Sequence, residues 1–177
     1  RTVLHDWNTG KIKFYCKAIN INPKLPEAHN NLGIIFKSQG KLDAAIAAHK
    51  KAIFLKPDYS DAYNNMGNAL QDLGKLNEAM KAFNEALSLK SNSAEVHRNL
   101  SALIKYKADD PQVCMVAQLI KKGLCSDKDL CQLHYAYAKM QEDLGELPSA
   151  LSHYVSGGLL RQNILRYNIS EDIIKFE

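Results

Sequence analysis

The sequence predicts an all-α protein built as a solenoid of antiparallel helix pairs. Two observations support this prediction. A pattern of apolar and glycine residues returns after 34 residues without a gap. Inside each copy the apolar residues recur every three or four positions, as the buried stripe of an α-helix does. A fixed period of this length is typical of stacked units in which each unit packs against its neighbours.

The repeat is clearest when residues 26–59 (PEAHNNLGIIFKSQGKLDAAIAAHKKAIFLKPDY) are aligned with residues 60–93 (SDAYNNMGNALQDLGKLNEAMKAFNEALSLKSNS). The first helix of each copy carries a stripe of residues at intervals of four, namely Ala28, Leu32 and Phe36 in one and Ala62, Met66 and Leu70 in the other. The second helices carry Ala45, His49 and Ala52, matched by Ala79, Phe83 and Ala86. Small residues at these places predict closely packed helices.

Two pairs of glycines occur at equivalent places in these copies. Gly33 and Gly67 lie in mid-helix, where glycine costs about 1 kcal/mol relative to alanine, so we expect close approach of the partner helix there. Gly40 and Gly74 lie where each first helix should end, and they predict a left-handed residue that stops it.

We expect residues 1–177 to form a single solenoid whose outer units are less regular. Its parts are a partial repeat (1–25), two regular repeats (26–59 and 60–93), two degenerate repeats (94–127 and 128–162) and a C-terminal helix, cap or linker (163–177). The first part offers a second helix without its first, so we expect the chain to begin inside a repeat. The apolar face left open there would permit self-association.

The degenerate repeats keep the register with altered turns. Residues 94–107 copy the first helix and place Ser101 at the close-packing position. The stop glycine is lost, and Asp110 is the expected N-cap of the next helix, with Pro111 at its first position. Ser126 is the expected cap of the helix after that. A last amphipathic helix starting near Ser170 is predicted from the spacing of Ile169, Ile173 and Phe176.

Composition and charge exclude several classes of protein. A hydrophobic share of 46% and a charged share of 24% are those of an ordinary globular protein. The net charge is +4, but basic and acidic residues alternate, so we expect no nucleic-acid partner and no membrane partner. No apolar stretch is long enough to span a bilayer, and we expect no secretory signal, because the first residues show no long apolar core behind basic residues. Its four cysteines form no C-x-x-C pair, which favours reduced thiols and a cytoplasmic location.

The sequence contains no recognisable catalytic or cofactor motif. Glu142 and Asp143 are adjacent and should point to different sides of a helix, which is poor geometry for acid–base catalysis. Cys131 and His134 would supply only two metal ligands, and no second pair has zinc-site spacing. We therefore expect no enzyme activity, no cofactor and no metal.

The two regular copies resemble the tetratricopeptide repeat (TPR) family. This resemblance implies a right-handed superhelix of helix pairs and a scaffold that binds a peptide or a partner protein in a concave groove. Other TPR domains bind a C-terminal carboxylate through a clamp of Lys, Asn and Arg. Of the clamp set only Asn65 is present, since Asn30, Ile34, Glu95 and Asn99 replace the others.

The motifs AHNNLG and AYNNMG are similar to the repeat array of O-GlcNAc transferase, where a row of asparagines grips peptide backbone. This likeness implies that Asn31, Asn65 and Asn99 form such a row, since a carboxamide both donates and accepts hydrogen bonds. In the alternative interpretation these asparagines are merely tolerated or bond to a neighbouring helix. Other residues expected on the inner surface are Asn30, Lys37, Asn64, Asn68, Gln71, Arg98 and Lys105.

Residues 97–176 also resemble the segment that precedes the catalytic domain in bacterial TPR–sulfotransferase fusion proteins. This likeness implies an alternative function, as the substrate-recruiting or regulatory arm of a larger enzyme of sulfotransferase or glycosyltransferase type. The catalytic domain of such an enzyme would be absent from this chain. RNA binding by a helical-hairpin array is a third option, which the lack of a basic face disfavours.

Overall fold

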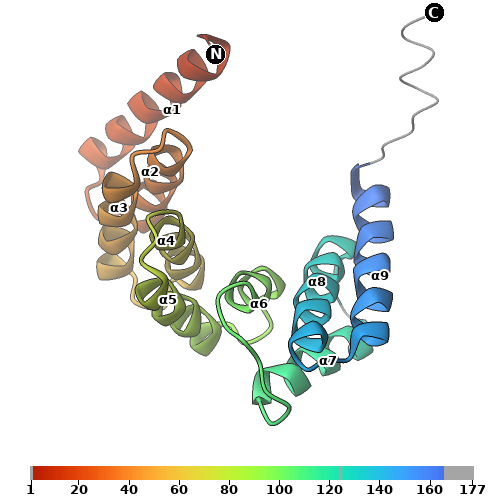
Figure 1. Cartoon of the computed structure of the whole chain (residues 1–177). Helices are drawn as coiled ribbons and strands as arrows, with labels where there is room; N and C mark the ends of the chain where they lie inside the picture. Colours follow the sequence, from red (N-terminus) through yellow and green to blue (C-terminus); the bar gives the residue numbers. More distant parts are fainter. Residues whose placement is uncertain (1, 124, 166–177) are drawn as a thin grey trace, which may run out of the picture. The chain divides into compact units, whose positions relative to one another are not determined.

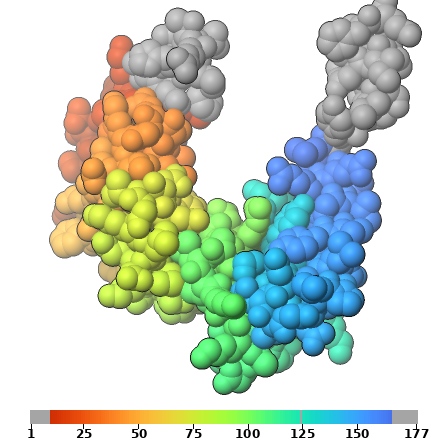
Figure 2. All heavy atoms as spheres, viewed as in Figure 1, coloured from red at the N-terminus to blue at the C-terminus, as the bar shows by residue number. Residues whose placement is uncertain are grey.

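A computed structural model describes residues 2–123 and 125–165, and this part of the chain is helical without a β-strand (Figure 1). The expected all-α solenoid of helix pairs is confirmed. The chain divides into two compact units, residues 1–91 and residues 92–177, whose coloured parts run from red to yellow-green and from green to blue in Figure 2. Within the described residues, no helix is both long and apolar enough to cross a membrane.

Unit 1 consists of α1 to α5, each packed against the next along the chain. The helices are α1 (Thr2–Ile21), α2 (Pro26–Ser38), α3 (Leu42–Leu55), α4 (Ser60–Asp72) and α5 (Leu76–Leu89). Helices α2 and α3 form one hairpin and α4 and α5 the next. The two first helices, α2 and α4, also contact each other. The equivalent residues of the two hairpins are thus brought side by side.

The stop glycines end the first helices as the sequence predicts. Gly40 and Gly74 have φ angles of 74° and 79°, in the left-handed region that L-residues with a Cβ avoid. The left-handed glycine turns the backbone back, and a hydrogen bond from the next residue closes each helix. The N–H of Lys41 donates to the carbonyl of Phe36 at 2.9 Å, and the N–H of Lys75 donates to the carbonyl of Leu70 at 2.9 Å.

Alanines fill the core of unit 1. The fully buried ones include Ala45, Ala52, Ala62, Ala69, Ala79 and Ala86. Because these side chains are small, facing helices approach closely, and one ring in each hairpin fills the remaining space together with Leu32, Ile35, Ile46 and Leu70. The ring is that of His49 in the first hairpin and that of Phe83 in the second, and both are completely buried.

Unit 2 is centred on α8. Helix α8 packs against the other three helices of the unit, which are α6, α7 and α9. The bounds are α6 (Ala94–Ser101), α7 (Pro111–Lys122), α8 (Asp127–Asp143) and α9 (Leu147–Leu165). The core comprises Ala94, Tyr106, Val116, Leu133, Ala136 and Met140.

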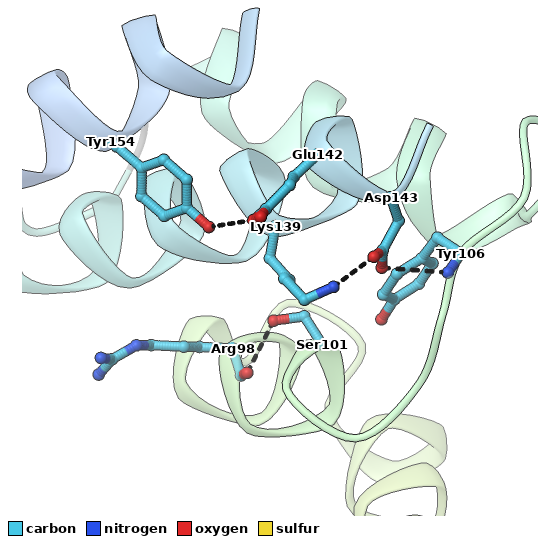
Figure 3. A network of polar contacts seen from close by, with 7 residues as sticks. All are labelled: Arg98, Ser101, Tyr106, Lys139, Glu142, Asp143 and Tyr154. Atoms are coloured by element: carbon cyan, nitrogen blue, oxygen red, sulfur yellow. Dashed lines mark hydrogen bonds and ion pairs between the residues drawn. The ribbon is translucent and has the colours of Figure 1, made fainter. Parts of the chain in front are cut away.

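The prediction of a first helix over residues 94–107 is wrong beyond Ser101, where α6 ends. The backbone leaves the helix, and Tyr106 enters the core with 2% of its surface exposed. Its N–H donates to Asp143 Oδ2 at 3.3 Å, and its hydroxyl lies 3.1 Å from Gln112 Oε1 (Figure 3 shows the Asp143 bond). Burial of this large aromatic side chain, with its hydroxyl and its backbone N–H both bonded, stabilises the non-helical segment.

The caps of α7 and α8 are those expected. The side chain of Asp110 accepts a hydrogen bond from the N–H of Gln112 at 2.9 Å, and Pro111 follows at the first helical position. The hydroxyl of Ser126 accepts from the N–H of Asp129 at 3.1 Å.

Helix α9 runs to Leu165, four residues past the point where the repeat pattern fades at Arg161. The amphipathic helix predicted from Ser170 lies outside the described residues. The division of the chain into one partial, two regular and two degenerate repeats of a single solenoid remains a prediction.

Candidate functional site

The ten residues expected on the inner surface differ in exposure. In unit 1, Asn31, Lys37, Asn65, Asn68 and Gln71 are half-buried on α2 and α4. In unit 2, Arg98 and Asn99 are half-buried on α6, and Lys105 is exposed after it. Asn30 and Asn64 are interior residues, with only 4% and 7% of their surface exposed. These two asparagines therefore offer much less surface to a ligand than the other eight residues do.

Asn30 is engaged inside unit 1. Its Oδ1 lies 3.0 Å from His49 Nδ1 of α3 and accepts from Asn65 Nδ2 of α4 at 3.1 Å. Its Nδ2 donates to the hydroxyl of Tyr59 at 3.5 Å. The side chain thus links α2 to its partner helix and to the next hairpin.

The imidazole of His49 explains the glycine opposite it. A Cβ on Gly33 would lie 2.6 Å from the His49 ring, and one on Gly67 would lie 2.6 Å from the Phe83 ring. The predicted close approach at both glycines is confirmed. Burial, assisted by the nearby charge of Lys37, lowers the pKa of His49 to about 4, so the ring is neutral at physiological pH.

Lys37 of α2 forms an ion pair with Asp72 of α4 at 2.9 Å, and both side chains remain substantially exposed. An exposed pair of this kind contributes up to about 1 kcal/mol. The pair links the C-terminal ends of α2 and α4, and the carboxylate of Asp72 offsets the positive charge of Lys37.

In unit 2, Arg98 is held by two neutral groups of α8. Its Nη1 donates to Gln132 Oε1 at 2.9 Å, and its guanidinium carbon lies 5.2 Å from the centre of the Tyr135 ring. Cys131 is buried next to them. Burial raises the pKa of the Cys131 thiol, and the charges of Arg98 and Arg161 act in the opposite direction.

Glu142 and Asp143 bind different partners, as expected for adjacent helical residues (Figure 3). The Tyr154 hydroxyl donates to Glu142 Oε2 at 2.9 Å. Burial is the larger cause and this bond the smaller cause that raise the pKa of Tyr154 to about 12. Asp143 pairs with Lys139 and accepts from the N–H of Tyr106. Both carboxylates are thus used within the fold.

His134 and His153 form a pair between α8 and α9, with their Nδ1 atoms 2.8 Å apart. Desolvation lowers the pKa of each, and the His153 charge adds to the effect on His134. Cys131 is not a third member, because its thiol donates to the carbonyl of Gly157 at 3.3 Å. Among the described residues no group of three or more possible metal ligands is present.

The sequence interpretation missed His49 and Tyr59 as partners of Asn30, and Gln132 and Tyr135 as partners of Arg98. A signal for the first was available. His49 occupies a place in the buried stripe where the next repeat has Phe83, and a buried imidazole needs a hydrogen-bond partner. Arg98 and Gln132 are 34 residues apart, close to the separation of 35 between Asn30 and Asn65, and they lie on α6 and α8, which pack against each other.

Comparison with known families identifies the repeats. Two models described as tetratricopeptide repeat match residues 14–47 and 60–93, and a third, described as TPR repeat, matches residues 35–74. Residues 14–93 are tetratricopeptide repeats. The matched region runs through most of unit 1 and includes both asparagine motifs of this TPR protein.

Solved structures share the fold of this TPR protein. MamA is 19% identical, with coverage of 88% of this chain and 90% of its own and a TM-score of 0.62. A Thermobaculum terrenum O-GlcNAc transferase is 22% identical, with coverage of 63% and 22% and a TM-score of 0.54. The first TPR of Spaghetti (RPAP3), bound to an HSP90 peptide, is 25% identical, with coverage of 58% and 88% and a TM-score of 0.52. No curated protein gives a significant match to the sequence.

Proposed function

We propose that this TPR protein is an interaction module that binds an extended peptide segment of a partner protein along α2 and α4. Asn31 and Asn65 carry the proposal. They occupy equivalent positions of two first helices that contact each other, and both are half-buried, so each has a surface that a ligand can reach. A side-chain amide suits a peptide ligand because it can accept from a backbone N–H or donate to a carbonyl.

The spacing of the repeats fits an extended chain. Adjacent first helices lie about 10 Å apart, and an extended peptide rises about 3.3 Å per residue, so each asparagine would meet every third peptide residue. Each such bond contributes about 0.5–1.5 kcal/mol, whereas a micromolar complex requires about 8 kcal/mol. Lys37, Asn68 and Gln71 are the neighbouring polar groups that we assign to the remaining contacts in unit 1.

In unit 2 by itself, we assign Arg98, Asn99 and Lys105 to contacts with a ligand of that unit. Arg98 keeps its positive charge available, because the Gln132 amide and the Tyr135 ring orient it without neutralising it. A peptide with an acidic side chain would gain a charge-assisted bond there.

The solved TPR of Spaghetti (RPAP3) with its HSP90 peptide supports peptide binding as a property of related repeats. The clamp residues of chaperone-tail binding are replaced here, so we propose a different peptide class. We further propose that the chain acts in the cytoplasm by binding rather than catalysis, without a nucleic-acid or membrane partner.

Alanine variants test the site. A peptide selected on the immobilised protein from a random-peptide display library serves as the probe. Asn31→Ala and Asn65→Ala should each weaken its binding about two- to tenfold in calorimetry. Asn84→Ala, on the exposed side of α5, is the matched control and should leave the affinity unchanged. Equal affinities of all four proteins, with unchanged circular dichroism, would reject the asparagine surface.

The alternative function, as an arm of a larger enzyme, draws support from the resemblance of residues 97–176 to TPR–sulfotransferase fusions. The reading frame beyond Glu177 tests it. A phosphosulfate-binding domain encoded there would favour this alternative, and its absence would remove the sulfotransferase version.

A further inference from the structure

We propose that Asn65 contacts the bound peptide through its carboxamide oxygen, as the acceptor of one peptide N–H, because Asn30 and His49 fix the orientation of its amide. The inference rests on the proposed function. It distinguishes Asn65 from Asn31, which occupies the equivalent position of the preceding repeat, because only Asn65 is bonded to Asn30. It also makes the buried His49 a positioning residue for the site.

The orientation follows from the bonds around Asn30. Its Oδ1 faces two nitrogen atoms, His49 Nδ1 at 3.0 Å and Asn65 Nδ2 at 3.1 Å. A carbonyl oxygen accepts two hydrogen bonds, so both nitrogens act as donors and His49 carries its proton on Nδ1. Nitrogen Nε2 of His49 is then a bare acceptor, buried without a partner.

The reversed arrangement is less favourable. If the Asn30 amide were turned, its nitrogen would face His49, and His49 would have to hold its proton on Nε2. That N–H would then be a buried donor without an acceptor. An orphaned donor is rarer in proteins than an under-satisfied acceptor, so the arrangement with the Nδ1 proton is favoured.

The consequence for Asn65 is geometric. One end of its planar amide, Nδ2, is turned toward α2, so the oxygen at the other end is turned away from Asn30. Asn65 is half-buried, and within residues 2–123 and 125–165 no donor is bonded to its oxygen. The oxygen is therefore the acceptor that Asn65 presents to a ligand, and a backbone N–H is its natural partner in a peptide.

The second hairpin supplies the variant for a test. Phe83 occupies the place equivalent to His49 and lies as close to Gly67 as His49 lies to Gly33, with a glycine Cβ placed 2.6 Å from the ring in both. His49→Phe thus has a precedent in the same fold. It removes the donor to Asn30 while it keeps a ring in the pocket.

The experiment uses the display-selected peptide and a series of its analogues in which one backbone amide at a time is replaced by an ester, which removes one N–H. One ester position should weaken binding to the native protein about two- to tenfold and should have no further effect on Asn65→Ala. Asn31→Ala is the control and should retain the full ester effect. His49→Phe should reduce that effect, because the amide of Asn65 is then free to turn.

Two outcomes would overturn the inference. In one, Asn65→Ala weakens binding but no ester position is coupled to it, which leaves the proposed function standing. In the other, His49→Phe retains the full coupled ester effect. If Asn65→Ala and Asn31→Ala both bind the peptide as tightly as the native protein does, the proposed site is rejected together with the inference.

A ligand-free measurement checks the orientation separately. Hydrogen exchange of the Asn65 side-chain amide, followed by NMR in the full chain, should be slow in the native protein and faster in His49→Phe. Equal exchange in the two proteins would show that His49 does not position Asn65.

Discussion

At the residue scale, Gly33 and Gly67 let a ring of the second helix pack against the backbone of the first. A helix interior otherwise disfavours glycine, so the contact with the ring compensates for the lower helix propensity at both positions. The structure shows that the close neighbour is a ring of the second helix, His49 in one hairpin and Phe83 in the other. The type of ring then decides whether the neighbouring asparagine is held in place, since an imidazole can bond to Asn30 and a phenyl ring cannot.

Gly67→Ala should destabilise the protein by about 1–3 kcal/mol, measured by urea denaturation, because its methyl group would overlap the rigid Phe83 ring. Gly158→Ala is the control. It lies in α9 with nothing within 4 Å of the added Cβ, so it should stabilise by up to about 1 kcal/mol through helix propensity. A neutral Gly67→Ala would mean that the ring moves aside without cost.

His49 predicts a loss of stability in acid. The pKa of His49 is 6.5 in the unfolded chain and about 4 in the folded protein, so between these pH values the unfolded state binds more protons. The free energy of unfolding therefore decreases as the pH is lowered through this range. The loss amounts to about 3 kcal/mol once the pH is below both values. Above about pH 6.5 His49 is neutral in both states, and this loss is absent.

The measurement compares the unfolding free energies of the native protein and His49→Phe as a function of pH. The other histidines are common to both and cancel in the difference. The native protein should lose stability relative to the variant as the pH falls from about 6.5 to about 4. A constant difference would show that the folded and unfolded pKa values of His49 are the same.

At the element scale, helix boundaries with chemical signals were predictable and the boundary without one was not. Asp110 and Ser126 cap α7 and α8 as expected, and Gly40 and Gly74 end α2 and α4. The end of α6 has no glycine or proline. It is set by Tyr106, whose burial depends on α7 and α8, so the competing contacts are long-range and invisible in a local pattern.

The cap of α7 gives a prediction at this scale. Asp110→Ala should destabilise unit 2 by about 0.5–2 kcal/mol, because the N–H of Gln112 loses its acceptor at the start of the helix. Asp109→Ala, at the exposed preceding residue, is the matched control and should change the unfolding free energy by less than about 0.5 kcal/mol. Equal effects of the two variants would contradict a specific capping role.

At the scale of the whole molecule, the period of 34 residues was sufficient to predict the fold class, since it repeats stop glycines and buried stripes together. The candidate site was predicted less well. Of two adjacent asparagines in one motif, Asn30 is buried and Asn31 is half-exposed, and this difference depends on packing against α3 and α4. The relation to sulfotransferase fusions remains a prediction.

The two compact units predict that destabilisation stays local. In repeat proteins stability is a sum of terms within units and between nearest neighbours. The core groups of the two units belong to different segments of the chain, Phe83 to residues 1–91 and Tyr106 to residues 92–177. A defect in one core should therefore lower the protection of its own helices first.

Hydrogen exchange with mass spectrometry on the full chain can measure this. Gly67→Ala should accelerate exchange in α2 to α5 more than in α8 and α9. Tyr106→Ala, which removes a buried aromatic side chain at a cost of about 3–5 kcal/mol, should produce the reverse pattern. Equal acceleration throughout the chain in either variant would mean that the units unfold together, because coupling between them would then exceed the loss within each.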